Sequence, residues 1–330
     1  MDEGTHSVLH PEKRLTLERD SGFEGNFPNA LHCVDIQIVS DTILVLKSGG
    51  RGADSLFFAA YSTKSFEYLG SFIHKGRSAG EMLDPHIAKT NTNYPFLAII
   101  DNQTGKACLI DVPRSIEKLE PSSAFHFDLP ENPADWCPLK DSTQLFLRIQ
   151  DNRLLFTVSD LSRRVIKDFD LYKKWNARKY MTKLSSLITA NMSNAGAAVL
   201  MICFPYLTLL SSDKPVRSCS TASDYKKWRR IIEAPFNPES VQYYMGVTST
   251  ADYIIALYYG CSIAQSMNPG HGCHLHIFDW AGNFLYDIET REDVTNIAFE
   301  PISKYLYCTS QFDDTIIRFD LSKVLPVNTY

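Results

Sequence analysis

The sequence contains no apolar run of about 18 residues, the length that a membrane-spanning helix requires. Its longest apolar stretch, residues 195–210, is interrupted by Gly196 and Pro205 and is better explained as two buried strands. The N-terminal sequence MDEGTHSVLHPEKR is polar and has no apolar signal core. We therefore expect no membrane-spanning helix. If the protein is exported, we expect that a signal peptide, with any lipid anchor, preceded Met1.

An excess of positive charge is also missing. The chain carries 33 Lys and Arg against 38 Asp and Glu, which gives a net charge of -5. Proteins that bind nucleic acids present strongly basic surfaces. We therefore expect no nucleic-acid partner, unless a local basic patch supplies one.

Linear signatures of metal and nucleotide sites are absent too. The sequence has no H-E-x-x-H motif, no G-x-x-x-x-G-K-[ST] loop and no C-x-x-C pair. Most of the eight cysteines lie inside apolar runs, where free cysteine behaves as a small buried apolar residue. Cys261 and Cys273 flank one hairpin loop and form the one pair worth testing as a disulfide.

Short β-type runs separated by turn residues are what the sequence does contain. His274–Asp279 and Phe284–Ile288 flank Gly282 and Asn283, a pattern typical of a tight hairpin. Four such runs follow one another between residues 34 and 73. The pattern predicts an all-β protein built from meanders.

The meander repeats along the chain. An apolar strand that ends in Asp or Ser before a short turn recurs six times, about 41 to 67 residues apart. These strand ends are Ser62, Asp111, Ser159, Ser212, Asp279 and Asp320. Because one such sheet cannot bury both of its faces alone, the units must stack in a closed ring. We predict one six-bladed β-propeller over residues 14–330.

The N-terminus is expected to close this ring. The last unit offers three strands only, whereas Arg14–Arg19 alternates polar and apolar residues as an isolated strand would. We predict that this strand completes the last blade and hides an edge. Residues 1–13 are expected to be a flexible tail.

Two segments predict short helical insertions between blades. Asp168–Ile188 has apolar residues at helical spacing, with Asp168 or Asp170 as the N-cap, and Ser223–Ile232 is a second candidate. Both are rich in basic and aromatic residues. The candidate binding residues here are Lys173, Lys174, Trp175, Lys226, Lys227 and Trp228. They could meet an anionic glycan, a lipid surface or an acidic protein; the alternative is a solvated helix face whose tryptophans dock on the propeller.

The loop Gly76-Arg-Ser-Ala-Gly-Glu81, followed by Pro85, resembles a turn of the TolB-like six-bladed propellers of Bacteroidetes. In that family the turn reads G-x-G-x-G-E-x-x-x-P; Gly76, Gly80, Glu81 and Pro85 match it, while Ser78 and Ala79 depart from it. The hairpin Phe278–Ile288 also resembles the family, and the likeness covers about residues 27–325. The resemblance implies a propeller fold and export, often with a lipid anchor.

Two glycine-rich loops, residues 49–52 and 75–81, could hold an anion through backbone N–H groups, with Arg51, Arg77 and Glu81 as candidate binding residues. The alternative is that they are turns between blades, in which Glu81 tethers the turn.

His274 and His276 would share one face of a strand, but a zinc site needs further ligands, for example His86 or Cys261. Packing explains the histidines more simply, so we predict no metal.

Propeller enzymes can assemble a central site from several blades, which leaves no linear pattern. Candidates for such a central site, judged by their location in the sequence, are Asp35, Asp101, Asn102 and Asp252, but many other acidic residues fit equally well. We therefore name no catalytic residue and expect no cofactor. The sequence favours a monomeric, non-catalytic propeller of the cell envelope that binds a small molecule, a glycan or a protein.

Two alternatives remain open. One is a metal-assisted lactonase or lyase, which calcium or zinc at the ring centre would favour. The other is a docking scaffold without a small-molecule site, which a flat central channel and an exposed apolar patch larger than about 600 Å² would favour.

Overall fold

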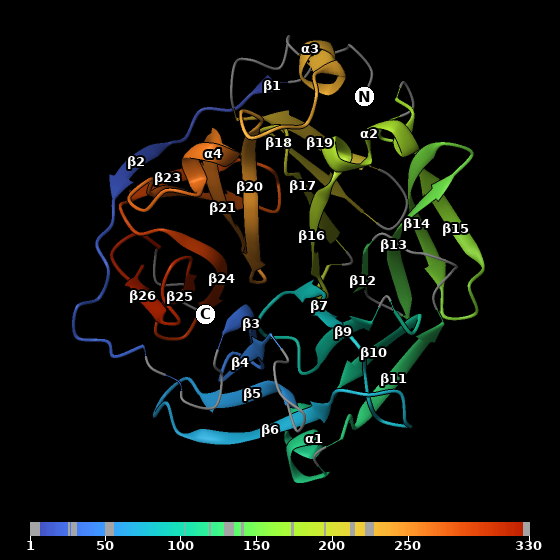
Figure 1. Ribbon diagram of the computed structural model, residues 1–330, viewed down its shortest axis with the longest axis vertical. Helices are drawn as coiled ribbons and strands as arrows, with labels where there is room; N and C mark the ends of the chain where they lie inside the picture. The colour runs from blue at the N-terminus through green and yellow to red at the C-terminus, as the bar shows by residue number, and fades with distance from the viewer. Residues whose placement is uncertain are drawn as a thin grey trace.

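The chain folds as a six-bladed β-propeller, in which six twisted sheets surround a common axis (Figure 1). This computed structural model describes residues 7–25, 27, 32–49, 56–101, 103–118, 120–128, 135–139, 142–172, 175–194, 196–211, 215–221 and 228–325. No helix in this described part is long and apolar enough to cross a membrane.

The first three blades follow one another in the chain and contain four antiparallel strands each. Blade one consists of β3 (Cys33–Val39), β4 (Ile43–Ser48), β5 (Leu56–Ser62) and β6 (Tyr68–His74). Blade two consists of β7 (Pro85–Ile87), β9 (Leu97–Asp101), β10 (Lys106–Ile110) and β11 (Ser123–Asp128). Blade three consists of β12 (Asp135–Leu139), β13 (Thr143–Gln150), β14 (Arg153–Asp160) and β15 (Val165–Phe169).

The remaining three blades complete the ring. Blade four consists of β16 (Ser186–Asn191), β17 (Gly196–Met201), β18 (Tyr206–Leu210) and β19 (Pro215–Ser220). Blade five consists of β20 (Val241–Ser249), β21 (Tyr253–Ser262), β22 (Cys273–Asp279) and β23 (Phe284–Thr290). Blade six has three strands, β24 (Val294–Glu300), β25 (Tyr305–Ser310) and β26 (Ile316–Asp320). The innermost strand of blade six packs against that of blade one, which closes the circle.

Five of the six predicted strand ends lie at or beside the end of the third strand of a blade, and the sixth, Ser212 beyond β18, lies outside the described residues. These third strands are β5, β10, β14, β18, β22 and β26. The predicted hairpin is also present: Gly282 adopts a φ of 82° and its N–H donates to Asp279 O at 3.0 Å. The prediction of six blades is confirmed.

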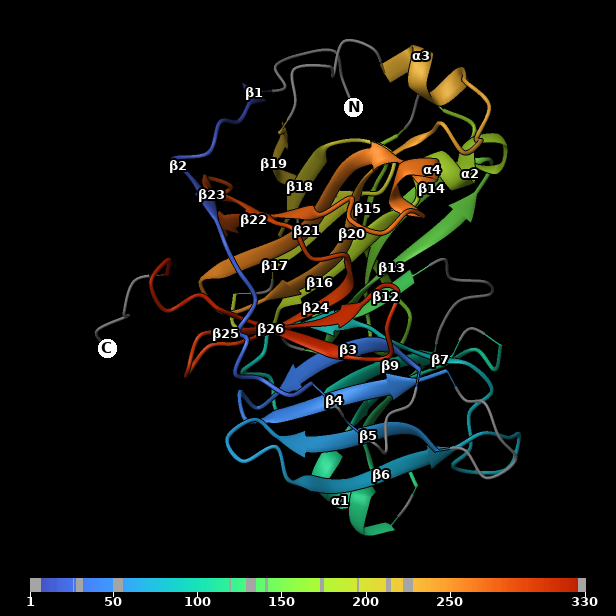
Figure 2. The same cartoon turned by 60° about the vertical axis from the view of Figure 1, so that its left-hand side comes forward.

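Residues 7–25 form an N-terminal belt that crosses the outer edges of three blades (Figure 2). Within it, β1 (Ser7–Val8) pairs in parallel with β19 of blade four, and β2 (Lys13–Thr16) pairs in parallel with β23 of blade five. Two further backbone hydrogen bonds fasten the belt to β26 of blade six, Asp20 N to Arg318 O and Ile316 N to Gly25 O. A Cβ on Gly25 would lie 1.6 Å from Ile316 O, so only glycine fits there.

The belt corrects two predictions. The predicted closing strand at residues 14–19 belongs to blade five rather than to the last blade, because its register follows the free edge of β23. Residues 20–25 cover the edge of blade six without forming a strand. Residues 7–13 were expected to belong to a tail but are held by backbone hydrogen bonds to blades four and five, while residues 1–6 lie outside the described residues.

A short stretch that leaves blade two crosses the middle of the ring. We call residues 88–94 the axial segment; it contains β8 (Lys89–Thr90), which pairs in parallel with β16 of blade four. Its Thr92 N–H donates to Ser249 O of blade five at 3.0 Å, while its Thr92 and Tyr94 carbonyls accept from Asp41 and Ser40 after β3. The segment thus joins blades one, four and five at the axis.

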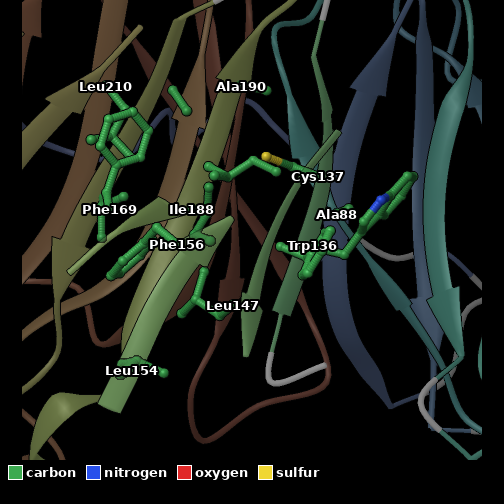
Figure 3. Packing of buried hydrophobic residues seen from close by; sticks show 14 of the residues in the cluster. Ala88, Trp136, Cys137, Leu147, Leu154, Phe156, Phe169, Ile188, Ala190 and Leu210 are labelled. Atoms are coloured by element: carbon green, nitrogen blue, oxygen red, sulfur yellow. The ribbon is translucent and has the colours of Figure 1, made fainter. Parts of the chain in front are cut away.

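Apolar side chains interlock between neighbouring blades, as Figure 3 shows for blades three and four. Trp136 on β12 is fully buried there, and its indole N–H donates to Gln144 Oε1 at 2.8 Å. Each large side chain buried in this way stabilises the fold by about 1.5–3 kcal/mol. The inter-blade layers therefore supply most of the apolar core.

The described part of the chain contains four short helices, α1 (Val112–Lys118), α2 (Ala177–Leu184), α3 (Trp228–Glu233) and α4 (Ile263–Ser266). The predicted helix over residues 168–188 was wrong in extent. Asp168 lies in the outer strand β15, Asn176 caps α2 by accepting from Lys179 N at 3.0 Å, and Ile188 belongs to β16. The second predicted helix is present as α3, although its expected start lies outside the described residues.

Candidate ligand-binding site

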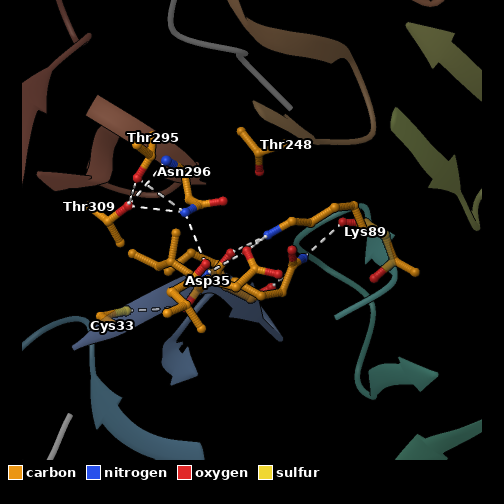
Figure 4. A network of polar contacts seen from close by, with 12 residues as sticks. Cys33, Asp35, Lys89, Thr248, Thr295, Asn296 and Thr309 are labelled. Carbon is orange, nitrogen blue, oxygen red and sulfur yellow. Dashed lines mark hydrogen bonds and ion pairs between the residues drawn. The ribbon is translucent and has the colours of Figure 1, made fainter. Parts of the chain in front are cut away.

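A polar network lies at the end of the ring axis where the innermost strands begin (Figure 4). Lys89 Nζ donates to Asp35 Oδ1 at 2.5 Å and to the carbonyl of Ile36 at 2.6 Å. The Lys89 and Asp35 side chains are 13% and 19% exposed, so water screens this charge-assisted pair only weakly. Because each charge compensates the other, the pair holds the axial segment against blade one.

The same network seals the junction between blades six and one. Asn296 Nδ2 donates to a backbone carbonyl of β3 at 3.1 Å and to Thr309 Oγ1 at 3.2 Å, and Thr295 and Thr309 share a hydroxyl hydrogen bond of 2.8 Å. Burial raises the pKa of Cys33 to about 12, so this thiol stays protonated. The described polar groups at this end form hydrogen bonds with one another. The network is therefore better suited to holding blades six and one together than to binding a ligand.

A cavity of about 330 Å³ lies at the opposite end of the axis, where the innermost strands finish. It is formed between blades two, three and four with the axial segment as one wall. Its apolar lining consists of Tyr94, Leu109, Phe127, Pro138, Leu139, Leu161 and Met192. Its polar lining consists of Asn91, Asn93, Ser142 and Ser193. Ligand sites in proteins are typically apolar hollows of this kind with a few polar groups.

The asparagines of the axial segment place the polar groups of the cavity. Asn91 Oδ1 accepts from Met192 N at 2.7 Å, which fixes the amide plane, and the Asn91 amide donates to Asn93 Oδ1. Asn93 is exposed and can offer its own amide N–H groups to a ligand. This arrangement gives the cavity hydrogen-bonding groups on its axial side.

The chemistry that this lining supports is binding. The described lining residues contain no carboxylate, imidazole, thiol or amine. Burial raises the pKa of Tyr94 to about 12, so its phenol is neutral at physiological pH. Among the described side chains, the cavity therefore has hydrogen-bond donors and acceptors but no group suited to general acid–base work.

The predicted anion-binding loops lie away from this cavity. Arg77 is exposed in the turn between β6 and β7, and Glu81 Oε2 accepts from Ser78 N at 2.8 Å across that turn. A Cβ on Gly76 would lie 1.9 Å from the Glu81 carboxylate, so glycine at this position lets the carboxylate come close to the turn. Glu81 thus tethers the turn, as the alternative interpretation expected. Arg51 lies outside the described residues.

The residues Gly76–Gly80 also spell G-x-S-x-G, the pattern of a hydrolase nucleophile elbow, although the interpretation of the sequence expected no such elbow. An elbow joins a strand to a helix and exposes its serine above a sheet. Here the Gly76 N–H donates to Met82 O and Lys75 bridges to Met82, so the segment is a turn between two strands. Its geometry does not match an elbow.

The predicted aromatic and basic site can be placed only in part. Trp175 is half-buried, packs against the core of blades three and four, and meets the Tyr180 ring edge-on at 6.0 Å. Lys183 is also buried, with Nζ 3.4 Å from Ser240 Oγ. Lys173, Lys174, Lys226, Lys227 and the Trp228 side chain lie outside the described residues.

The acidic residues proposed by location do not converge. Asp35 pairs with Lys89, as described above, while buried Asp101 accepts from Leu83 N at 2.8 Å and Gln103 N at 3.1 Å and so shapes a turn. Asp252 lies in the β20–β21 turn, where its N–H donates to Thr250 Oγ1. Asn102 lies outside the described residues.

All eight cysteines are free thiols, including Cys261 and Cys273, and most are buried.

The structure brings a third candidate metal ligand to the two histidines, from a residue that the sequence interpretation missed. His274 and His276 share a face of β22, as predicted, and Asp287 on β23 lies beside them. The hydrogen bond to Asp287 raises the pKa of His274, whereas burial lowers the pKa of His276 to about 3. Burial alone would raise the pKa of Asp287, but its hydrogen bond to His274 and the neighbouring charges lower it.

No protein-family model and no curated protein sequence matches this chain. Among solved structures, the fold is similar to that of a DUF4221 family member from Bacteroides vulgatus, with a TM-score of 0.57, 11% identity and coverage of 94% of this chain and 96% of that one. It is also similar to a Bacteroides fragilis protein provisionally described as exported, with a TM-score of 0.52, 13% identity and coverage of 92% and 93%. These likenesses show a fold shared with Bacteroides proteins.

Proposed function

We propose that this protein is a non-catalytic binding propeller of the cell envelope that takes a small, neutral and largely apolar molecule into the cavity between blades two, three and four. The observation that carries the proposal is the cavity itself, about 330 Å³ with seven apolar or aromatic and four amide or hydroxyl lining residues. This volume lies within the range of small-molecule sites.

The lining defines the ligand chemistry. An apolar body would displace water from Leu139, Leu161 and Met192, and each buried methylene contributes roughly 0.8 kcal/mol. A hydrogen-bonding end would meet Asn93 and the serines. Because the described lining carries no charge, a charged ligand would lose its hydration without gaining an ion pair.

A place in the cell envelope is supported by the TolB-like resemblance and by the exported description of the Bacteroides fragilis structure. The test is fractionation of the source cells with an antibody against the protein. Recovery in the envelope or periplasmic fraction is expected, and recovery with the cytoplasmic markers alone would overturn this part of the proposal.

The binding test uses the neutral fluorescent amphiphile N-phenyl-1-naphthylamine as the probe. Replacing Met192, which lines the cavity, with Trp fills part of the volume and should weaken probe binding about 10-fold or more, since overpacking costs ~1–3 kcal/mol. Met267→Trp is the matched control, because Met267 is 66% exposed and lies on a different blade. Equal affinity in both variants would show that the probe binds elsewhere.

A further inference from the structure

A second site, independent of the cavity, lies between the outer part of blade five and blade four, beneath the N-terminal belt. On β22 and β23, His276 is the direct cross-strand partner of Asp287, and His274 lies two residues before His276. Residues two apart on a strand, and directly opposite residues on neighbouring antiparallel strands, share a face. The register therefore brings two imidazoles and one carboxylate together.

The three side chains converge at distances close to those of a coordination shell. His274 Nδ1 lies 2.7 Å and His276 Nε2 lies 3.6 Å from the same Asp287 oxygen, Oδ1, and the three ligand atoms all lie within 4.8 Å of one another. Ligand atoms about 2.0 Å from a tetrahedral zinc ion are roughly 3.3 Å apart. His274 is 38% exposed and can turn to reach this spacing.

Surrounding aromatic groups fix the orientation of His276. Its ring stacks on Tyr258 with centroids 4.1 Å apart and contacts Phe284 at 4.7 Å. Its Nδ1 lies 3.5 Å from the Tyr244 hydroxyl, which in turn lies 3.0 Å from Thr221 Oγ1. A hydrogen bond from Nδ1–H to Tyr244 leaves the Nε2 lone pair directed at the cluster, which is the outer-shell arrangement of metal-bound histidines.

The belt completes the surroundings of the carboxylate. Arg14 on β2 lies opposite Asp287, and its Nε is 3.7 Å from Oδ2, whereas the histidine contacts given above are to Oδ1. The guanidinium is 76% exposed, so its charge is largely screened by water at the cluster. Arg14 can orient the carboxylate while leaving Oδ1 for a cation.

We propose that His274, His276 and Asp287 bind a divalent transition-metal ion, with zinc the first candidate. Two imidazoles and one carboxylate suit such ions better than calcium or magnesium, which prefer all-oxygen shells. Three protein ligands leave a fourth position open, as in zinc sites that bind water or a substrate group. The half-exposed His274 gives that position access to solvent.

The experiment measures zinc binding to chelator-treated protein by calorimetry, and cobalt(II) spectra report the ligand type. One zinc per chain is expected, with a cobalt spectrum that lacks the charge-transfer band of thiolate ligands. Asp287→Asn and His274→Ala should each weaken zinc binding by about 100-fold or more, and Tyr244→Phe, which removes an outer-shell partner, by about 10-fold. All variants are compared by their circular dichroism spectra in chelator.

His86→Ala is the matched control. His86 also contacts a carboxylate, with Nε2 3.2 Å from Asp84 Oδ2 and half of its side chain exposed, but among the described residues it belongs to no group of three potential metal ligands. Zinc affinity should stay unchanged in this variant. If Asp287→Asn and His274→Ala bind zinc as tightly as His86→Ala, or if cobalt shows thiolate ligation, the proposal is wrong.

Discussion

Arg318 on β26 shows how one side chain can fasten the belt to the last blade. Its guanidinium lies over the rings of Phe23 and Tyr305, 4.5 Å and 4.1 Å from their centroids, and it donates from Nε and Nη2 to Asp20 Oδ2. The hydrogen bond from Arg318 holds the pKa of Asp20 below its ordinary value. Asp20 and Arg318 are separated by most of the chain, so their pairing reports on ring closure.

At this residue we predict a pH-dependent loss of stability. Asp20→Asn keeps the Oδ1 acceptor for Gly22 N but removes the charge, and should lower the free energy of unfolding by about 1–2 kcal/mol at pH 7. Because the pKa of folded Asp20 is lowered, its contribution is complete above the unfolded value of ~3.9 and is lost as the pH falls through the folded value. The difference between wild type and variant should therefore shrink below about pH 4.

Urea unfolding at several pH values measures this effect. Glu292→Gln is the control, since Glu292 forms a looser pair with Arg19 of the belt at 3.8 Å and should cost less than about 0.5 kcal/mol. A difference for Asp20→Asn that stays constant down to pH 3 would contradict the assigned role of the charge.

The residues of the proposed metal site were predictable in part. Strand periodicity correctly placed His274 and His276 on one face, but Asp287 was missed because its position depends on the register across the hairpin. That register includes an irregularity between Ile277 and Phe278, which shifts the pairing. Counting back from the Gly282 turn would have placed Asp287 near His276 to within one residue.

At the scale of elements, strands were easier to predict than helices. The four apolar runs predicted between residues 34 and 73 are bounded by turn residues, and they correspond to β3 to β6, which span Cys33 to His74. One helix was wrongly predicted over residues 168–188, because apolar residues of β15, α2 and β16 fall by coincidence at helical spacing. In the fold, Asp168 bonds instead to Arg148 and Thr157 of its own sheet.

The N-terminal belt leads to a prediction about truncation. Removing residues 1–20 deletes β1, β2 and the Asp20 contact, and with them backbone hydrogen bonds such as Leu9 N to Ser220 O and Leu17 N to Glu289 O. At a net value near 1 kcal/mol for each bond, the loss should be roughly 3 kcal/mol or more and should lower the melting temperature. Removing residues 1–6 alone leaves every described contact of the belt in place and should have little effect. Equal melting temperatures for the two truncations, measured by calorimetry, would show that the belt adds no stability.

At the scale of the whole molecule, the ring was predictable but the cavity was not. Six repeated strand ends implied six stacked sheets, because each sheet has two faces to bury. The cavity depends on Leu139, Met192 and Tyr94, which come from three separate parts of the chain and meet only after the axial segment has crossed the ring. No local pattern records that crossing, since Lys89–Thr90 looks like the continuation of a blade-two strand.

The axial segment should also be the most protected part of the ring. Its Asn91 and Thr92 N–H groups donate to Ala190 O and Ser249 O and are enclosed by the innermost strands, whereas β15 is an outer strand with mostly exposed side chains. Local opening is rarest where buried contacts are densest. Hydrogen exchange measured by mass spectrometry should therefore be slowest over residues 88–94 and much faster over β15. Equal exchange rates would mean that the axial segment opens on its own.

The belt also sets the order of events on the ribosome. β2 emerges early, but β23 lies about 270 residues further along the nascent chain and β26 about 300. At roughly 5–20 residues per second, the first strands wait about 15–60 s for these partners. Translation therefore delivers an open arc of sheets, and the belt can pair with blades five and six only after Asp320 has been synthesised.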